Sequence, residues 1–494
     1  MGKVRKNGSL LRSFPVKEHL ILGLIAILTM LFATLSSPLY PLNNWVDSNA
    51  FFTMGKAMFN GKVLYRDVFD HKGPILHFLH GVAWLISNRS FFGVWVLEII
   101  ACYFTLLFSY RILELYTDKR AILMMPVFAV LLYTTSAMAK GDSAEEFCLP
   151  LLMYAVLIAI RSLKEKKEIS KKSLLLVGIT SGVIAWIKYT MLGFYLGWII
   201  LPMLLAVKAK NWKYILNMVL YIGAGVVIAT LPVLAYFLLN GALSDLWEVY
   251  FYINIFKYDP NPEGCSVQVY LLSILHNVLL PNMGVISLMV IGGIWAVVKR
   301  KFLLAVQVIL MLLGGFLVVY SNIISFPYYM VIFCGFAIFG FIPLYRLLPG
   351  AVAKLKGKLY AAILIAVCLL ALPASYVLSD NTDMLQYEKE DLPQFQFAQI
   401  INQKENATVL NCGFMDGGFY TVSGVVPSTK YFCLMNANID EAVEEQKEAI
   451  RSGAVDFVIT KNQKITAKRY EEVMTSTFEY RGQEHEYTLY RKID

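Results

Sequence analysis

The sequence predicts an all-α polytopic membrane protein with a soluble α/β domain at its C-terminal end. Of its 494 residues, 57% are apolar and 16% are charged, whereas soluble domains carry about 25% charged residues. Its mean hydropathy is +0.58. Apolar runs of ~20 residues, the length that crosses ~30 Å of hydrocarbon, recur between residues 20 and 378. The stretch 379–494 has an ordinary soluble composition.

About eleven apolar runs are long enough to be transmembrane helices. They are 20–40, 91–113, 121–137, 147–163, 173–188, 190–207, 214–239, 281–298, 302–320, 326–345 and 359–378. The first run is too long for the core of a signal peptide and lacks a small-residue cleavage site, so it is predicted to be a retained helix. The run 75–87 is short and contains His77 and His80. It is predicted to be interfacial or re-entrant and not to span.

The distribution of positive charge orients these helices. If the segment 1–19 is cytoplasmic, the inner segments hold more than half of the 44 Lys and Arg residues and few acids, as the positive-inside rule requires. Counting 75–87 as a span would move every later basic loop outside. The net charge of +9 therefore indicates topology and not a nucleic-acid partner. This topology places the loop 41–90 and the domain 379–494 outside.

The first outer loop concentrates ionisable residues. Its stretch "YRDVFDHKGP" contains Arg66, Asp67, Asp70, His71 and Lys72. Charged groups near a membrane are costly, so their clustering suggests a functional site. Such a site can hold an anionic head group with cations while a carboxylate accepts a proton from a hydroxyl. The alternative is that these are solvated loop charges.

Upstream of this cluster, the loop contains an amphipathic stretch. Phe51, Met54 and Met58 fall at helical spacing and predict a short helix that either lies in the membrane interface or packs on other helices. Asp47 stands at the start of this helix. There its carboxylate either caps free amide groups or belongs to the functional site.

A second acidic turn, "KGDSAEEF", is predicted to lie on the same outer face. Its acids are Asp142, Glu145 and Glu146. Glu98 is the acid placed well inside a predicted span, so it should face protein or water. It either lines a lipid groove or pairs with a basic side chain.

The C-terminal domain has the pattern of an α/β fold. Strands are predicted at 407–414, 454–461 and 485–492, and a helix at 438–453 ends at Gly453. The domain contains no metal-ligand spacing and no Gly-rich phosphate loop. Cys412 and Cys433 are its two cysteines, which permits a disulfide without implying one. A structural role or recognition of an acceptor is expected.

The stretch "WVDSNAFFTMGKAMFNGKVLYRDVFDHKGP" resembles the first outer loop of bacterial GT-C glycosyltransferases related to protein O-mannosyltransferases and aminoarabinose transferases. In that family an Asp after the first span precedes an aromatic helix, a G-x-x-x-Y-x-D turn and a Pro that opens an apolar segment. The resemblance covers most of the chain and is specific at the loop. It implies a GT-C membrane module at 20–378, with its catalytic loop at 41–90, in a bacterial plasma membrane.

The activity implied by the resemblance is sugar transfer from a polyprenyl-phosphate donor to an acceptor hydroxyl at the outer face. The acceptor would be an envelope glycan, a glycolipid or a protein. Asp47 would be the general base, and Lys72, with Arg66 and His71 as further candidates, would offset charge on the leaving phosphate. Lys188 either joins this phosphate site or is a lysine that snorkels to the interface.

Other positions also take implied roles. Tyr328 and Tyr329 occupy the place of a His-Tyr pair that faces the donor phosphate in the family, although Pro327 replaces the His. The acids of the second turn, together with Asp67 and Asp70, would orient the acceptor or form a second acidic site. Oxygen ligands of this kind suit Mg²⁺, Mn²⁺ or Ca²⁺, but the implied chemistry requires no metal or other cofactor.

Two other classes of function stay open. A polytopic transporter or flippase of envelope precursors would also have many spans, but inverted repeats and broken helices around a midplane site are not visible in the sequence. A non-catalytic envelope-assembly protein would use the outer domain to bind a partner. No G-x-S-x-G motif or zinc-ligand spacing supports a hydrolase.

Overall fold

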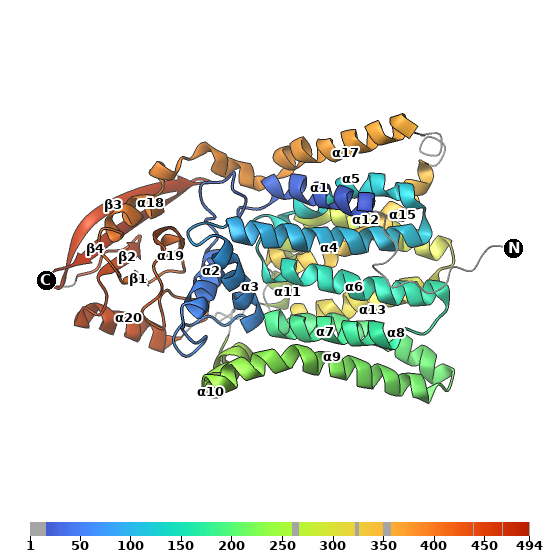
Figure 1. Cartoon of the computed structure of the whole chain (residues 1–494), viewed down its shortest axis with the longest axis horizontal. Coiled ribbons are helices and arrows are strands. Elements are labelled where there is room, and N and C mark those ends of the chain that lie inside the picture. The colour runs from blue at the N-terminus through green and yellow to red at the C-terminus, as the bar shows by residue number, and fades with distance from the viewer. Residues whose placement is uncertain are drawn as a thin grey trace.

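The computed structural model describes residues 16–258, 266–321, 326–348, 357–437, 439–466 and 468–493. Long helices form a bundle, and a small domain with a β-sheet covers one end of it (Figure 1). Helices α2 (Val46–Phe59) and α3 (Pro74–Ile86) lie between the bundle and the sheet. The predicted combination of an all-α membrane module and a C-terminal α/β domain is confirmed.

The bundle is built from the apolar helices. They are α1 (Val16–Ala33), α4 (Phe92–Tyr116), α5 (Met125–Tyr133), α6 (Ala144–Glu165), α7 (Lys171–Lys188), α8 (Leu192–Lys208), α9 (Trp212–Leu239), α11 (Val267–Ile274), α12 (Met283–Val298), α13 (Phe302–Val319), α14 (Val331–Cys334), α15 (Ile338–Leu347) and α17 (Gly357–Leu378). In the described part of the chain, nine helical runs are long and apolar enough to cross a membrane. The predicted number of about eleven spans stays a prediction.

The bounds of the helices agree with the predicted runs at some places and differ at others. The first helix ends at Ala33 and not near residue 40, because the Leu35 amide donates to the Lys140 carbonyl at 3.0 Å. The predicted separation of the runs 173–188 and 190–207 is present, because the run Lys171–Lys208 divides at Lys188, whose backbone is extended with φ −158° and ψ 96°. Helix α3 has 13 residues, which is too short to span.

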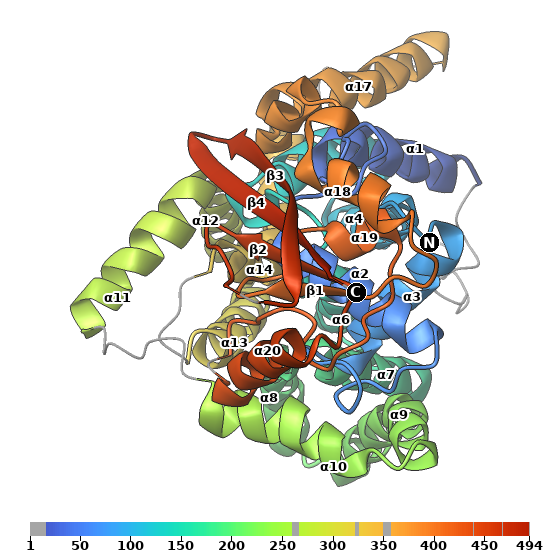
Figure 2. The same cartoon turned by 90° about the vertical axis from the view of Figure 1, so that its left-hand side faces the viewer.

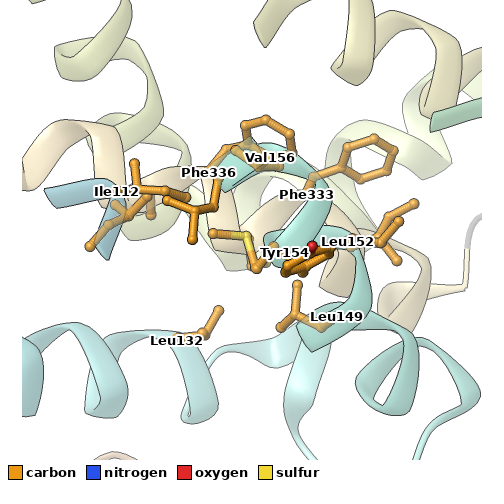
Figure 3. Packing of buried hydrophobic residues seen from close by; sticks show 14 of the residues in the cluster. Ile112, Leu132, Leu149, Leu152, Tyr154, Val156, Phe333 and Phe336 are labelled. Atoms are coloured by element: carbon orange, nitrogen blue, oxygen red, sulfur yellow. The ribbon is translucent and has the colours of Figure 1, made fainter. Parts of the chain in front are cut away.

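Helix α6 supplies much of the core of the bundle. Leu149, Leu152, Tyr154 and Val156 of this helix lie among aromatic side chains that include Phe333 (Figure 3).

Close helix contacts elsewhere depend on small residues. A Cβ atom on Gly197 of α8 would lie 1.9 Å from the carbonyl oxygen of Leu310 in α13, so only glycine permits that contact.

The C-terminal domain contains a four-stranded sheet. Its order is β1 (Val409–Cys412), β2 (Phe457–Lys461), β4 (Gln483–Lys492) and β3 (Tyr470–Tyr480). β1 and β2 are parallel, and the other pairs are antiparallel. The helices are α18 (Pro393–Ile401), α19 (Phe419–Ser423) and α20 (Asp440–Ser452). The three predicted strands and the predicted helix are present, whereas β3 was not predicted. Cys412 and Cys433 are free thiols.

Helix α2 is fixed between α3 and the C-terminal domain, and the sheet lies over it when the molecule is viewed from that end (Figure 2). Phe51, Phe52 and Met54 are buried inside the protein. Of the two environments expected for this helix, packing on other elements is therefore the correct one, and the interfacial alternative is wrong.

Polar contacts join α2 to the domain. The fully buried Lys56 Nζ donates to the Tyr420 carbonyl at 2.6 Å, and Thr53 Oγ1 donates to Asp416 Oδ2 at 2.7 Å. Thr421 Oγ1 donates to Asn49 Oδ1 at 2.9 Å. Because buried polar groups need partners, these contacts set the position of the domain on the helix that carries Asp47.

Candidate functional site

A small cavity of about 70 Å³ lies where the C-terminal end of α7 meets the segment before α3. Five of the residues predicted to bind a donor phosphate line it: His71, Lys72, Lys188, Tyr328 and Tyr329. They come from segments far apart in the sequence, and Tyr258 and Asn254 complete the same wall. The fold thus brings two lysines and several aromatic rings to one hollow.

Lys188 is the last residue of α7, and its side chain lines this cavity. Its Nζ donates to Glu145 Oε1 at 2.5 Å and lies 3.9 Å from the centre of the Tyr329 ring and 5.4 Å from that of Tyr328. Cation–π contacts of this kind hold an ammonium group in place. The lysine is thus fixed by protein groups and is not a free side chain at a lipid surface.

Lys72 is fixed from both its backbone and its side chain. Tyr65 Oη donates to the Lys72 carbonyl at 2.6 Å, and the Lys72 amide donates to Asp70 Oδ1 at 3.3 Å. Its Nζ lies 2.8 Å from His71 Nε2. An ammonium group has only donors, so His71 Nε2 must accept and the imidazole must be neutral. Burial and the neighbouring Lys72 hold the pKa of His71 well below its usual range, which agrees with a neutral ring.

Asp70 lies behind the cavity, between two histidines. Its carboxylate oxygens are 3.6 Å from His71 Nδ1 and 3.6 Å from His77 Nε2. Burial raises the pKa of Asp70, and burial together with His80 lowers the pKa of His77 to about 3. The Asp70 carboxylate thus faces the His71 ring, which orients Lys72. Asp70 itself lines neither this cavity nor the larger one beside it.

A larger cavity of about 420 Å³ adjoins the first and shares Tyr328 and Asn436 with it. Asp47 lines this cavity from the first turn of α2. Burial raises the pKa of Asp47, whereas Lys72 lowers it. Trp45 occupies the N-cap position, and no hydrogen bond joins the Asp47 carboxylate to the described residues. The expected capping role is therefore not observed.

The second acidic turn divides its acids among different partners. Asp142 accepts from His80 Nε2 at 2.9 Å and from Ser48 Oγ at 2.5 Å, whereas Glu145 pairs with Lys188. His80 Nδ1 lies 2.8 Å from the Leu76 carbonyl, so both ring nitrogens face acceptors and the ring is an imidazolium. Burial alone would lower the pKa of His80, but Asp142 raises it.

The remaining acids of this region do not reach either cavity. Glu146 is buried without a hydrogen-bond partner among the described residues. Glu98 accepts from Thr34 Oγ1 at 2.7 Å and from the Asp142 amide at 2.8 Å, so it supports the acidic turn. Glu98 lines neither of these two cavities, and among the described residues it forms no ion pair with a basic side chain. Across the described ranges, no group of three or more His, Cys, Asp or Glu side chains is arranged to hold a metal ion.

Arg66 and Asp67 lie away from both cavities. Arg66 Nε is 2.9 Å from Asp67 Oδ1, and their side chains are 45% and 28% exposed. Arg66 also donates to the Asn240 carbonyl at 2.9 Å. The pair fixes the end of α9 to the loop, so the structure separates these two residues from the other predicted site residues.

Two cations of the larger cavity were not predicted as site residues. Lys140 lies in the second turn and Arg481 in the loop between β3 and β4, and both line the cavity with Asp47. Lys140 lies in the acidic turn that the sequence analysis identified, but only the acids of that turn were predicted to be site residues. Arg481 has no local signal, because only the folded chain brings the C-terminal hairpin to the membrane module.

Comparison with solved structures shows which known fold this protein has. The fold is similar to that of ArnT from Cupriavidus metallidurans bound to undecaprenyl phosphate, with a TM-score of 0.64 and 12% identity over 94% of this chain and 97% of that chain. The apo structure of the same ArnT gives a TM-score of 0.61 and 12% identity over 96% and 98%. The chain is thus a multi-pass membrane protein with the GT-C fold of the aminoarabinose transferases.

The sequence itself then gives the particular family. Residues 10–344 match the family described as "Putative competence-induced protein Ccs4 N-terminal domain", and the chain belongs to that family. No curated protein matches the sequence.

Proposed function

We propose that this protein is a membrane glycosyltransferase that moves a sugar from a polyprenyl-phosphate donor to an acceptor hydroxyl. One observation carries the proposal: a cavity lined by Lys72 and Lys188 adjoins a cavity lined by Asp47, and Tyr328 borders both. The fold supports the donor class, because the ArnT structure of the same fold holds undecaprenyl phosphate.

The smaller cavity is suited to the donor phosphate. As the sugar leaves, negative charge grows on the phosphate oxygens, and fixed cations stabilise it most when they need no rearrangement. Lys188 is held by Glu145 and two tyrosine rings, and Lys72 is held by His71. Two preorganised ammonium groups can supply the charge that a divalent cation supplies in other enzymes.

Asp47 is suited to the general-base step. The acceptor oxygen forms a bond to the anomeric carbon while the bond from that carbon to the phosphate oxygen breaks, and the phosphate keeps the electron pair. The hydroxyl proton passes to the Asp47 carboxylate. Because burial raises the pKa of this carboxyl, the ionised form is a stronger base than an exposed aspartate.

The cellular arrangement follows from the charge bias. With the N-terminal segment in the cytoplasm, both cavities and the C-terminal domain face the outside of a bacterial plasma membrane. The acceptor would then be an envelope glycan, a glycolipid or a protein. The domain closes one side of the larger cavity through Met415, Asn436 and Arg481, which suits contact with an acceptor.

A direct test uses the purified full-length protein in lipid nanodiscs with polyprenyl-phosphate hexoses and pentoses. The expected result is release of free polyprenyl phosphate together with sugar transfer to an envelope extract. Movement of the intact lipid-linked sugar between leaflets without release of phosphate would instead identify a flippase. An unchanged profile of lipid-linked sugars and envelope glycans in a deletion strain would favour a non-catalytic assembly protein.

A further inference from the structure

Two of the described residues line both cavities, and they mark the passage from the donor phosphate to the general base. Tyr328 comes from the bundle, and Asn436 comes from the C-terminal domain. The smaller cavity, of about 70 Å³, has a sixth of the volume of the larger one, of about 420 Å³. Because the sugar of the donor is bonded directly to the phosphate, a phosphate in the smaller cavity must place its sugar past Tyr328 and Asn436, in the larger cavity.

Three aromatic rings line the larger cavity and extend from this passage. Tyr328 stacks on Phe326 with ring centres 5.3 Å apart and planes at 9°, and the Trp45 ring lies 5.8 Å from that of Tyr328. Trp45, Phe326 and Tyr328 are here named the aromatic wall. One face of a sugar ring carries several C–H groups, and the electron-rich face of an aromatic ring attracts their hydrogens. The aromatic wall therefore suits the apolar face of a sugar.

The helix that follows Trp45 does not account for a tryptophan at this position. Trp45 is the N-cap residue of α2 and makes no side-chain cap, although Ser, Thr, Asp or Asn is preferred there. Its backbone is fixed, because its amide donates to Asn43 Oδ1 at 3.0 Å and its carbonyl accepts from Asn49 Nδ2 at 2.9 Å. Its indole N–H has no hydrogen-bond partner among the described residues and is not fully buried. The ring is thus held in place beside Asp47 with a donor to spare.

Asn436 supplies a polar group at the same passage. Its side chain is exposed, and no hydrogen bond joins its amide group to the described residues. A primary amide has two N–H donors and a carbonyl acceptor, so it can bind a hydroxyl group in either role. Sites for small molecules typically combine aromatic walls with a few polar groups that fix the orientation of the ligand. The aromatic wall and Asn436 together have this composition.

We propose that the donor sugar binds in the larger cavity with one face against the aromatic wall and a hydroxyl group hydrogen-bonded to the Asn436 amide. This inference rests on the proposed function and deepens it by assigning a subsite to the transferred sugar. The ligand of this subsite is a sugar ring with one open C–H face and a hydroxyl group at its edge. Asn436 thereby makes the C-terminal domain a determinant of which donor sugar is used.

The first experiment measures binding and requires no transfer. Full-length protein in nanodiscs is titrated with undecaprenyl phosphate and with undecaprenyl-phosphate-linked glucose, galactose, mannose, N-acetylglucosamine and arabinose. The ratio of the two dissociation constants, without and with the sugar, gives the affinity that the sugar adds. For the sugar that the wild type binds most tightly, this ratio is expected to fall by about tenfold in Asn436→Leu and in Trp45→Leu. Trp45→Phe keeps an aromatic face and should retain most of it.

Controls separate this subsite from the phosphate site and from changes elsewhere in the domain. Asn402→Leu makes the same exchange at an exposed position of the C-terminal domain that lines neither cavity, and it should retain the wild-type ratio. Asn436 is exposed, so Asn436→Leu should fold even where Trp45→Leu does not. A wild-type ratio of one for every sugar, an unchanged ratio in Asn436→Leu, or an equal loss of affinity for undecaprenyl phosphate and its sugar conjugates would overturn the proposal.

The second experiment identifies the hydroxyl group that Asn436 binds. Donors that each lack one hydroxyl group are compared, by kcat/KM, with the complete donor that the transfer assay identifies. The wild type should discriminate against one of them by about tenfold or more, and Asn436→Leu should use that donor and the complete one about equally. Equal discrimination by both proteins would overturn this inference and leave the proposed function intact. A wild-type protein that neither binds nor consumes any polyprenyl-phosphate sugar would contradict the proposed function itself.

Discussion

At the scale of single residues, the segment from Asp70 to Lys72 shows how three adjacent side chains take different tasks. Lys72 lines the donor cavity, and His71 receives a hydrogen bond from its ammonium group at 2.8 Å. The Asp70 carboxylate faces His71 Nδ1, where it favours the tautomer that leaves Nε2 free to accept. The segment thus orients a cation with a neutral ring.

The first prediction tests this orientation. His71→Leu removes the acceptor for Lys72, so the affinity for undecaprenyl phosphate should fall by about tenfold, as expected for one charged hydrogen bond. His71→Gln offers a carbonyl oxygen in its place and should retain most of the affinity. Binding of radiolabelled undecaprenyl phosphate measures both variants. Equal losses in the two would show that ring packing on Tyr258, and not hydrogen bonding, is what matters.

The second prediction concerns the pH dependence of transfer. Asp47 must be ionised to act as a base, so kcat/KM should rise with pH through a pKa above the ordinary range of an aspartate, in the direction that burial sets. Lys140 favours the ionised form. Lys140→Gln should therefore shift the rise of kcat/KM to higher pH. A measurement of kcat/KM against pH for the wild type and the variant checks this prediction. A rise that stays at the same pH would show that Asp47 is not the group that titrates.

At the scale of elements, the sequence indicated the long apolar helices, the short helix before the second span and the amphipathic helix that ends at Gly453. Each of these elements can be predicted locally, because the length of an apolar run and a helical period are both properties of residues that are close in the sequence. The strand Tyr470–Tyr480 has only two buried residues and no regular alternation of buried and exposed positions, and it forms because β4 pairs with it.

The third prediction concerns the contact between α2 and the C-terminal domain. Lys56→Met leaves the buried Tyr420 carbonyl without its donor and Asp416 without a nearby cation, so it should lower the free energy of unfolding by about 2 kcal/mol. Burial lowers the pKa of Lys56 from an ordinary lysine value of 10.5 to about 7. Between these two values the unfolded chain binds more protons than the folded one, so stability from this group rises with pH.

Thermal unfolding of the wild type and of Lys56→Met at pH 7 and pH 9 measures both effects. The difference in unfolding temperature between the two proteins should itself change with pH, whereas Lys62→Met serves as a lysine control on the same loop. Identical pH dependence in wild type and Lys56→Met would show that Lys56 keeps its ordinary proton affinity in the folded protein.

At the scale of the whole molecule, the site forms from three regions that the sequence keeps far apart. The loop 41–90 supplies Asp47 and Lys72, the bundle supplies Lys188 and the tyrosines, and the last hairpin supplies Arg481. The sequence allowed prediction of site residues that stand in an unusual local context, such as the lysine within "FDHKGP". Lys140 and Arg481 could not be predicted as site residues, because only folding creates the cavity that they line.

The fourth prediction concerns topology. A cysteine at Asn60, which is exposed, should react with a membrane-impermeant reagent in intact cells, because the first outer loop faces outward. A cysteine at Lys166, in the basic turn after α6, should react only after the membrane is opened. Labelling of the unmodified chain gives the background. The reverse pattern would place both cavities in the cytoplasm.

The central claim is that Asp47 is the base in sugar transfer from a polyprenyl-phosphate donor. The most direct measurement compares the transfer rates of purified Asp47→Asn and Asp67→Asn in nanodiscs. Asp47→Asn should bind undecaprenyl phosphate and transfer sugar more slowly by about 10³-fold, a typical loss for a general base. Asp67→Asn alters a partly exposed acid of the same loop that lines neither cavity, and it should transfer at the wild-type rate. A near-normal rate in Asp47→Asn would contradict the account.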